Sequence, residues 1–544
     1  MPGKQRPNVL LIMSDQHRGD CLDFVARPDG QQLRVQTPHL RRLAEEGICF
    51  RNCYSESPVC VPARALLQTG ILPHRSGIFA NGDPLPANAP TLAGCLAANG
   101  YFTQAIGKMH FRPVRAHHGL QRLWLSEEIP YTVAEDEFLR FLLGAGYGHV
   151  EEPNGIRHEM YLLPQVSQLP ETHHTTAWTG RETIRFLREQ TTERREQPFF
   201  CWTSFQKPHP PFEPPVPWHR LYQPSMAPAP VKSDDELRWL PTTMGSAAFQ
   251  QFIDQFPDYN RLATMWSYYF SAISFIDSWI GMLLDELERL ALRENTLVLY
   301  VSDHGEHMGD HWTFGKSTFY DAAAHVPAIL SWPAGLPQGK VRRQLVGLTD
   351  VAPTILDAAG VDPAPFGLRP DGLSLLPAAR EDAPTRPVLI GQVGKGASAH
   401  LAALNADWKY VYAAGDNREL LFRRNGPEGE LRNELVDPSR EAAAAAEELR
   451  ATLQQRYRHD GATEALDEHS PNGFRLLPAR NTPDLRASDP EVRHTRRMWQ
   501  YARWIRELPE GWTPPPASEA GSIPADQPPR SDRSRYTWAR MLGS

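Results

Sequence analysis

The sequence predicts an α/β protein in which helices flank a large, mixed but mostly parallel β-sheet, followed by a small C-terminal α+β subdomain. Two continuous apolar runs, NVLLIM at residues 8–13 and TLVLYV at 296–301, each end in a Ser-Asp pair. Such runs are typical of strands buried on both faces. Because helical patterns separate the strands, we expect the strands to run parallel and to collect polar residues at their carboxyl ends.

The intervening segments carry helix and strand signals of their own. TPHLRRLAEEG, at residues 37–47, places proline at the first helical position and glycine beyond the last turn. TLAGCLAANGY at 91–101 predicts another helix, and YFTQAIGK at 101–108 predicts a strand. A long amphipathic pattern at 262–290 predicts a helix that leads into the second Ser-Asp strand. The proline-rich residues 208–230 are expected to form an irregular surface loop.

The chain divides into three parts by composition. Residues 1–386 hold the alternating strands and helices and are expected to form the main domain, which would carry the functional site. Residues 387–458 combine short strand patterns with one strong helix pattern, EAAAAAEELRATLQQRY, and predict an antiparallel sheet with a helix. Residues 459–544 are rich in proline and arginine, with Trp499, Trp504 and Trp512 as apolar anchors. This tail is expected to wrap the body or a partner in a homo-oligomer.

Composition and charge exclude several classes of function. The 544-residue chain has a formal net charge of −7 without charged blocks, so no nucleic-acid partner is expected. No apolar stretch approaches the ~20 residues needed to cross a bilayer, so no membrane partner is expected. The apolar run after the basic start ends at Asp15, too short for a signal peptide. Six cysteines without a CxxC pair argue against a disulfide framework or a zinc ribbon and favour a cytoplasmic location.

One cysteine has unusual neighbours. Cys60 lies in SPVCVPARALLQTG, where Pro62 can occupy the first position of a helix and Gly70 can end it. The thiol would then lie at or just before a helix N-terminus, which favours an anion, with Arg64 in the first turn. A packed thiol in a capping loop is the plain alternative. A phosphatase loop needs more than three residues between cysteine and arginine, and the papain-like cysteine signature is absent.

Other polar residues follow predicted strands. Asp15, Lys108 and Asp303 each come just after one, so a parallel sheet would bring them to one rim. Lys108 and His110 alternate in GKMHF and would point to one face of an extended segment. The GKS in FGKSTFYD suggests a nucleotide loop. That interpretation fails because Asp310 stands where such a loop needs glycine and no strand precedes it.

The stretch CVPARALLQTG resembles the signature of the sulfatase family, in which the cysteine is oxidised after synthesis to formylglycine. The family pattern is Cys-x-Pro-x-Arg followed by Leu-x-Thr-Gly-like residues, and the defining positions Cys60, Pro62 and Arg64 are intact. Ala63 replaces the commoner serine and Gln68 replaces a leucine. The resemblance implies a formylglycine-generating enzyme as a partner during maturation.

This resemblance extends over residues 8 to about 316 and implies an alkaline-phosphatase-like fold and the hydrolysis of a small-molecule sulfuric ester. The hydrate of an aldehyde offers two hydroxyl groups on one carbon. One oxygen can attack sulfur, and the other can later expel sulfate by collapsing to a carbonyl. Covalent catalysis is thereby split into two easier steps.

The resemblance also assigns one divalent metal to Asp15, Gln16, Asp303, His304 and the residue derived from Cys60. Many relatives carry aspartate in place of Gln16 and asparagine in place of His304. The present set therefore has one carboxylate fewer and a nitrogen ligand, which suits a hard cation less well. Calcium is the expected ion, with manganese and magnesium left open.

Catalytic roles follow from the same resemblance. Arg64 and Lys108 would hold the diol and stabilise developing negative charge, and Lys316 would bind the sulfate. His110 would act as the base when the hemiacetal collapses. His209, in the proline-rich loop, would face the leaving group and could donate its proton. With the nucleophile at position 60, these residues form the expected catalytic set.

A zinc site is an alternative use of the histidines after the second Ser-Asp strand. His304, His307 and His311 have helix-like spacing, but Gly305 and Gly309 make a regular helix unfavourable. We therefore expect His307 and His311 to stabilise their loop.

Three functional hypotheses remain open at this point. The leading one is a sulfuric ester hydrolase. A phosphonate monoester or phosphodiester hydrolase on the same fold is favoured by Gln16 and His304, whereas Lys108 and His110 favour sulfate. A catalytically inactive binding protein would result if Cys60 is not modified. Aryl, sugar and choline sulfates all fit as esters, with the loops at 127–155 and 205–218 expected to contact the leaving group.

Overall fold

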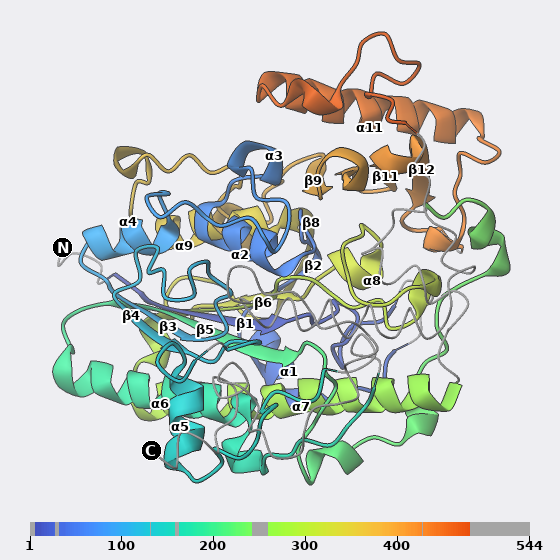
Figure 1. Ribbon diagram of the computed structural model, residues 1–544. Coiled ribbons are helices and arrows are strands. Elements are labelled where there is room, and N and C mark those ends of the chain that lie inside the picture. The colour runs from blue at the N-terminus through green and yellow to red at the C-terminus, as the bar shows by residue number, and fades with distance from the viewer. Residues whose placement is uncertain are drawn as a thin grey trace, which may run out of the picture.

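The computed structural model describes residues 6–27, 32–130, 132–157, 163–241, 259–426 and 428–478. Within them, eight strands form one twisted sheet in the order β4-β3-β5-β1-β6-β7-β2-β8 (Figure 1). Neighbouring strands run parallel except at β7, which is antiparallel to β6 and β2. This confirms the predicted mixed, mostly parallel sheet. The strands are β1 (Asn8–Asp15), β2 (Ile48–Tyr54), β3 (Phe102–Gly107), β4 (Arg122–Leu125), β5 (Phe199–Pro208), β6 (Thr296–Ser302), β7 (Ala328–Ser331) and β8 (Lys340–Gly347).

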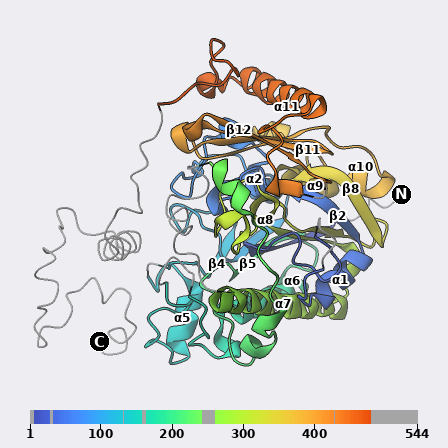
Figure 2. The same cartoon turned by 90° about the vertical axis from the view of Figure 1, so that its right-hand side faces the viewer.

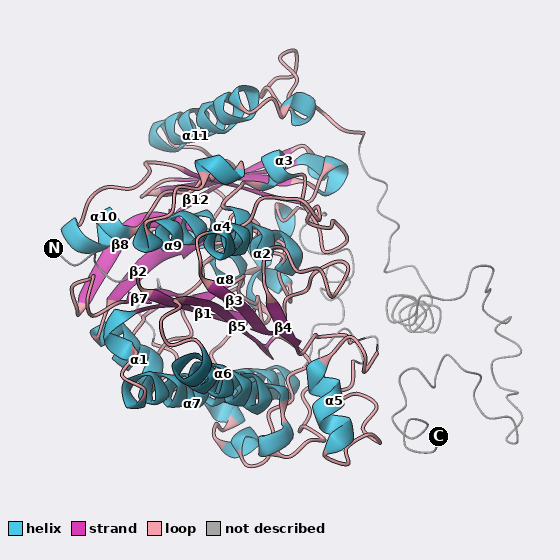
Figure 3. Ribbon diagram, turned by 90° about the vertical axis from the view of Figure 1, so that its left-hand side faces the viewer, coloured by secondary structure: helices cyan, strands magenta, loops and turns pink. Residues whose placement is uncertain are grey.

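Helices cover both faces of this sheet (Figure 3). One face packs against α2 (Cys60–Thr69), α4 (Leu92–Ala98), α9 (Val351–Ala359) and α10 (Leu376–Glu381). The opposite face packs against α1 (Pro38–Glu45), α5 (Glu137–Gly144), α6 (Thr175–Glu193) and α7 (Tyr259–Arg289). Two short helices, α3 (Pro73–Ser76) and α8 (Asp321–Ala324), lie in connections. In the described part of the chain, no helix has the length and apolar character needed to cross a bilayer.

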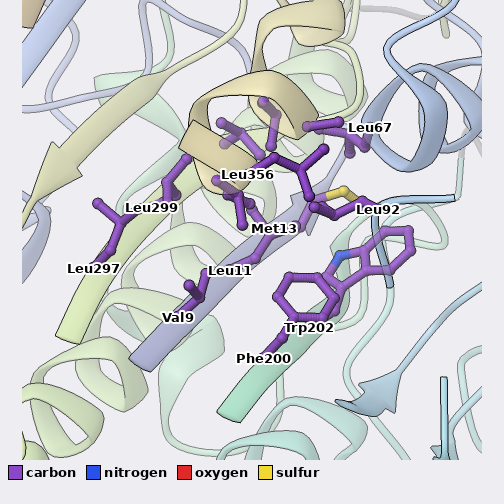
Figure 4. Close-up of a cluster of buried hydrophobic side chains, with 14 of the residues drawn as sticks. Val9, Leu11, Met13, Leu67, Leu92, Phe200, Trp202, Leu297, Leu299 and Leu356 are labelled. Carbon is purple, nitrogen blue, oxygen red and sulfur yellow. The ribbon is translucent and has the colours of Figure 1, made fainter. Parts of the chain in front are cut away.

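The central strand β1 contributes to both hydrophobic cores. Val9, Leu11 and Met13 point toward α2, α4 and α9 (Figure 4), and Leu10 and Ile12 point toward α1 and α7. All five side chains are at most 1 % exposed, as expected for a strand buried on both faces. The continuous apolar run NVLLIM is explained by this double burial.

A smaller sheet lies beside the main body (Figure 2). Its antiparallel strands are β9 (Leu389–Val393), β10 (His400–Leu404), β11 (Trp408–Ala413) and β12 (Arg418–Arg423). Helix α11 (Arg440–His459) packs on one face through alanines and leucines. The other face packs on Tyr54, Phe319 and Tyr320 of the main body. The predicted antiparallel strands and helix are confirmed as elements, and a domain boundary at residue 386 stays a prediction.

The predicted tail is described only in its first part. Leu466 and Phe474 are buried in the core of the small sheet and α11, and the Phe474 ring stacks on Tyr412 with centroids 4.2 Å apart. Residues 479–544, including the predicted anchors Trp499, Trp504 and Trp512, lie outside the described residues.

Two local expectations are corrected. Helix α2 begins at Cys60 itself, and Pro62 is its third residue, where a missing N–H costs nothing because the first turn has no internal partner for it. The free N–H of Val61 is satisfied instead by Asn81 Oδ1 at 3.0 Å. The segment after β5 is irregular but largely buried up to Pro215. The buried Lys207 ammonium donates to the carbonyl of Pro211 in this segment at 2.9 Å and to that of Asn154 at 3.3 Å, which ties the segment to a neighbouring loop.

Parallel register brings the carboxyl ends of four strands to one edge. Gly107 of β3 pairs with Ser204 of β5, and Ser14 of β1 pairs with Phe205 of β5 and Ser302 of β6. The residues that follow these strands therefore emerge side by side, as the sequence pattern predicts.

Gly107 marks a close approach at this edge. Its φ is 97°, and a Cβ built there would lie 2.0 Å from the carbonyl oxygen of Ser204. We expect Gly107→Ala to lower the free energy of unfolding by more than about 2 kcal/mol, because both strain and a backbone clash oppose it. Gly144→Ala is the matched control, since Gly144 is exposed at the end of α5 and nothing lies within 4 Å of its Cβ position. Denaturant unfolding would measure both, and equal stabilities would contradict the prediction.

Candidate active site

Four potential ligands meet at the carboxyl edge of the sheet. Asp15 ends β1, Cys60 begins α2, and Asp303 and His304 follow β6. One ligand atom from each lies within 4.8 Å of the others, and all four side chains are buried. Cys60 Sγ lies 3.2 Å from His304 Nε2 and 3.9 Å from Asp15 Oδ1. Residues separated by more than 280 positions are thus assembled around one thiol.

Gln16 joins this group through both its backbone and its side chain. Its φ is 72°, a left-handed conformation, and its N–H donates to Asp303 Oδ1 at 2.9 Å. Its Oε1 accepts from Lys316 Nζ at 2.7 Å, and its Nε2 donates to Glu306. Lys316 Nζ also lies 3.1 Å from Cys60 Sγ. Lys316 therefore bridges the amide oxygen of Gln16 and the thiol of Cys60.

This donor set fits a divalent metal. It combines two carboxylates, an amide oxygen and an imidazole, which suit a hard or borderline cation. Burial alone would raise the pKa of Asp15, but Lys108, His209 and Arg64 hold it well below its usual range. Asp303 Oδ2 is buried and accepts no hydrogen bond from any residue in the described ranges. Buried carboxylate oxygens with lone pairs still available are what a cation requires.

Arg64 binds the two carboxylates from the helix that carries Cys60. It lies one turn after Cys60, on the same face of α2. Its Nη2 lies 3.0 Å from Asp15 Oδ2 and 3.4 Å from Asp303 Oδ2, and its Nη1 donates to Ser204 Oγ at 3.0 Å. Burial opposes its charge, but Asp303 and Asp15 raise its pKa, so the guanidinium stays charged.

Lys108 is a fully buried ammonium between two carboxylates. Its Nζ lies 2.6 Å from Asp15 Oδ2 and 2.7 Å from Glu128 Oε2. The same Glu128 oxygen lies 3.6 Å from His209 Nε2. Burial opposes the charge of Lys108, but Asp15 and Glu128 raise its pKa well above its usual range. Glu128 thus connects Lys108 with His209 of the proline-rich loop. No sequence motif had indicated this glutamate.

His110 reaches the thiol by a different backbone path from the one expected. Its φ is 58°, so the segment after β3 is not extended. The turn is held by Glu127 Oε1, which accepts from the N–H groups of Met109 at 2.8 Å and His110 at 3.0 Å. Burial lowers the pKa of His110, and a hydrogen bond to Cys60 opposes that shift. Lys108 and His110 therefore both face the site, but a supported turn places them there.

The family model described as Sulfatase matches residues 7–361, well over half of the chain. The chain belongs to the sulfatase family.

Two curated relatives are also named as sulfatases. The choline-sulfatase of Rhizobium meliloti is 29 % identical over 443 residues, covering 80 % of this chain and 83 % of that protein. An arylsulfatase of Clostridium perfringens is 31 % identical over 388 residues, covering 65 % and 75 %. Among solved structures, a phosphonate monoester hydrolase from Silicibacter pomeroyi matches with a TM-score of 0.69 and 25 % identity, covering 88 % of this chain and all of that one. The predicted family and alkaline-phosphatase-like fold are confirmed.

The two further histidines of this sulfatase loop have separate partners. His307 Nε2 lies 2.7 Å from Thr318 Oγ1, and His311 Nδ1 lies 2.6 Å from Glu236 Oε1. Neither joins His304 in the group of potential ligands. This agrees with the expectation that they stabilise the loop and gives no support to a three-histidine zinc site.

Three carboxylates that support the sulfatase site were missed by motif reasoning. Glu127 and Glu128 follow β4 as Asp15 follows β1, so the same strand-end signal could have found them. Glu306 binds the amide of Gln16 and the N–H groups of Met308 and Gly315. No sequence signal separates this glutamate from an ordinary loop residue.

The role of Glu127 can be tested through stability. We expect Glu127→Leu to lower the free energy of unfolding by at least about 2 kcal/mol, because two buried N–H groups at residues 109 and 110 lose their acceptor. Glu127→Gln keeps one acceptor oxygen and should lose less than half as much. Denaturant unfolding measures the stability of both variants. Equal losses of unfolding free energy would show that the side-chain oxygen of residue 127 is not what supports the turn.

Proposed function

We propose that this chain hydrolyses sulfate monoesters of small molecules, with Cys60 converted to formylglycine and one divalent metal, calcium, in the site. The observation that carries the proposal is the grouping of the Cys60 thiol with two carboxylates and an imidazole at the N-terminus of α2. Arg64 and Lys108 bind the Asp15 carboxylate beside it, and Lys316 contacts the thiol. Several cations around one nucleophile suit an anionic tetrahedral substrate.

In this proposal, Asp15, Gln16, Asp303 and His304 hold the metal together with residue 60. When bound, the metal would supply positive charge that binds sulfate oxygens and lowers the pKa of a coordinated hydroxyl. The donor set leaves manganese and magnesium open beside calcium.

The remaining roles belong to residues of the chain itself. The Sγ of Cys60 marks the position of the two oxygens of a formylglycine hydrate. One of these oxygens would be the nucleophile of the reaction. Lys316, 3.1 Å from that sulfur, binds the sulfate. His110 is hydrogen-bonded to the same sulfur. It would bind the second hydroxyl of the hydrate and take its proton when sulfate is expelled. Arg64 keeps the carboxylates and helix in place.

Phosphonate monoester hydrolysis is a second candidate. Gln16 and His304 are the residues that favour it, and a phosphonate monoester hydrolase is among the similar solved structures. Lys108 and His110 favour sulfate, and we rank sulfate first on their contacts with Asp15 and Cys60. A cytoplasmic location, a formylglycine-generating partner and assembly through residues 459–544 remain predictions of the sequence.

The modification is the first property to measure. Peptide mass spectrometry of residues 52–64, on protein produced in a host that makes formylglycine, should show the thiol of Cys60 replaced by an aldehyde or its hydrate. A wholly unmodified thiol would favour the binding-protein hypothesis. Cys60→Ala supplies the control peptide and should be inactive on every ester.

Activity on a panel of esters tests the substrate class. Aryl, sugar and choline sulfates would be compared with a phosphonate monoester and a phosphodiester by kcat/KM. We expect a sulfate to be preferred, and we expect a chelator to abolish activity until calcium, manganese or magnesium is restored. If kcat/KM is higher for the phosphonate ester by orders of magnitude, the chain is a phosphonate monoester hydrolase, the second candidate.

A further inference from the structure

Glu128 is a buried carboxylate shared by Lys108, Arg157 and His209. It follows β4 and is 8 % exposed. Its Oε2 lies 2.7 Å from Lys108 Nζ and 3.6 Å from His209 Nε2, and its Oε1 lies 2.6 Å from Arg157 Nη1. The carboxylate is therefore held on both oxygens, and its position relative to His209 is fixed by the two cations.

Both ring nitrogens of His209 face oxygen acceptors. Nδ1 lies 2.6 Å from the carbonyl oxygen of Pro210, which can only accept a hydrogen bond, so Nδ1 carries hydrogen. Nε2 faces the carboxylate of Glu128. A neutral imidazole with hydrogen on Nδ1 would turn a lone pair toward that carboxylate. Only the imidazolium, with hydrogen on both nitrogens, suits both partners.

The pKa of His209 lies well below its usual range, chiefly because the imidazole is buried. Burial lowers its pKa, Glu128 and Asp15 raise it, and Lys316 and Lys108 lower it. Arg157 and His110 also interact electrostatically with the Glu128 carboxylate and lower its pKa. The site without an ester therefore favours neutral His209. A bound sulfate ester adds negative charge among these groups, which favours uptake of a proton.

We propose that Glu128 is a positioning residue that holds His209 as the imidazolium once an anionic ester is bound, so that His209 can protonate the departing oxygen. This inference rests on the proposed esterase function. As the nucleophilic oxygen bonds to sulfur, the bond from sulfur to the ester oxygen breaks and Nε2–H passes to that oxygen. The alcohol leaves, and His209 returns to the neutral form with hydrogen on Nδ1, still bound to Pro210.

This assignment has a consequence for substrate class. Proton donation matters most when the leaving group is a poor one, such as a simple alcohol, and least for a good one such as 4-nitrophenol. The geometry therefore points to alkyl or sugar esters as the substrates that this site is built to cleave.

The test is leaving-group dependence. Glu128→Gln keeps the size of the side chain and removes its charge. Across a series of esters, we expect kcat/KM to fall by about 100-fold for the alcohol ester and by less than about tenfold for the 4-nitrophenyl ester. Adding His209→Gln to this variant should cost little more than His209→Gln alone, because both act on one proton. Glu447→Gln, an exposed position on α11 and outside both loops expected to contact the leaving group, is the control and should leave every rate unchanged.

A merely structural role gives a different pattern. If Glu128 only anchors Lys108, its substitution lowers kcat/KM by the same factor for every ester. The loss in the double variant then equals the product of the two single losses. Either result overturns the proposal. Nuclear magnetic resonance of isotope-labelled histidine, with His209→Gln for assignment, gives a readout that does not need activity. With inorganic sulfate bound, His209 should carry both protons in the wild type and one in Glu128→Gln. A neutral His209 in the wild type would overturn this inference alone, whereas inactivity on every ester would overturn the proposed function.

Discussion

The carboxylate of Asp15 is the contact on which the rest of the site depends. Its Oδ2 lies 2.6 Å from Lys108 Nζ and 3.0 Å from Arg64 Nη2, with all three side chains at most 2 % exposed. One oxygen therefore joins β1, the segment after β3 and helix α2. Removing one member of a buried charge group costs roughly 3–5 kcal/mol, because the remaining charge is left without a partner. The same pairings that hold these elements together also place cations beside Cys60.

A second layer of carboxylates keeps this arrangement in register. Glu127 holds the backbone turn at Met109 and His110, Glu128 holds Lys108, and Glu306 holds the amide of Gln16. Each is at most 8 % exposed and is bound through several donors. Such support keeps the reacting groups in their productive geometry. This matters because the rate of catalysis falls steeply when those groups are displaced even slightly. Buried carboxylates that do not themselves contact Cys60 thus position the groups around it.

The small C-terminal sheet stabilises the loop that carries Lys316. Lys409 of β11 is buried, donates to the carbonyl of Phe319 at 2.8 Å and forms ion pairs with Asp321 and Glu430. Phe319 and Tyr320 pack on the face of that sheet opposite α11. Although this sheet contributes no side chain to the group around Cys60, it holds the loop between β6 and α8 in place.

The sequence alone determined the strand-and-helix order, the buried strand β1, and the placement of Asp15, Lys108 and Asp303 at the carboxyl edge. Each depended on a local signal: an apolar run, a capping pattern, or a polar residue after a strand. Tertiary structure decided that α2 begins at Cys60, that His110 reaches the thiol through a turn with φ of 58°, and that the segment after β5 is buried. It also decided that Glu128 serves both Lys108 and His209. These features depend on contacts between segments about 20 to 100 residues apart, set by strand register and by the pairing of buried charges, and no local pattern encodes such contacts.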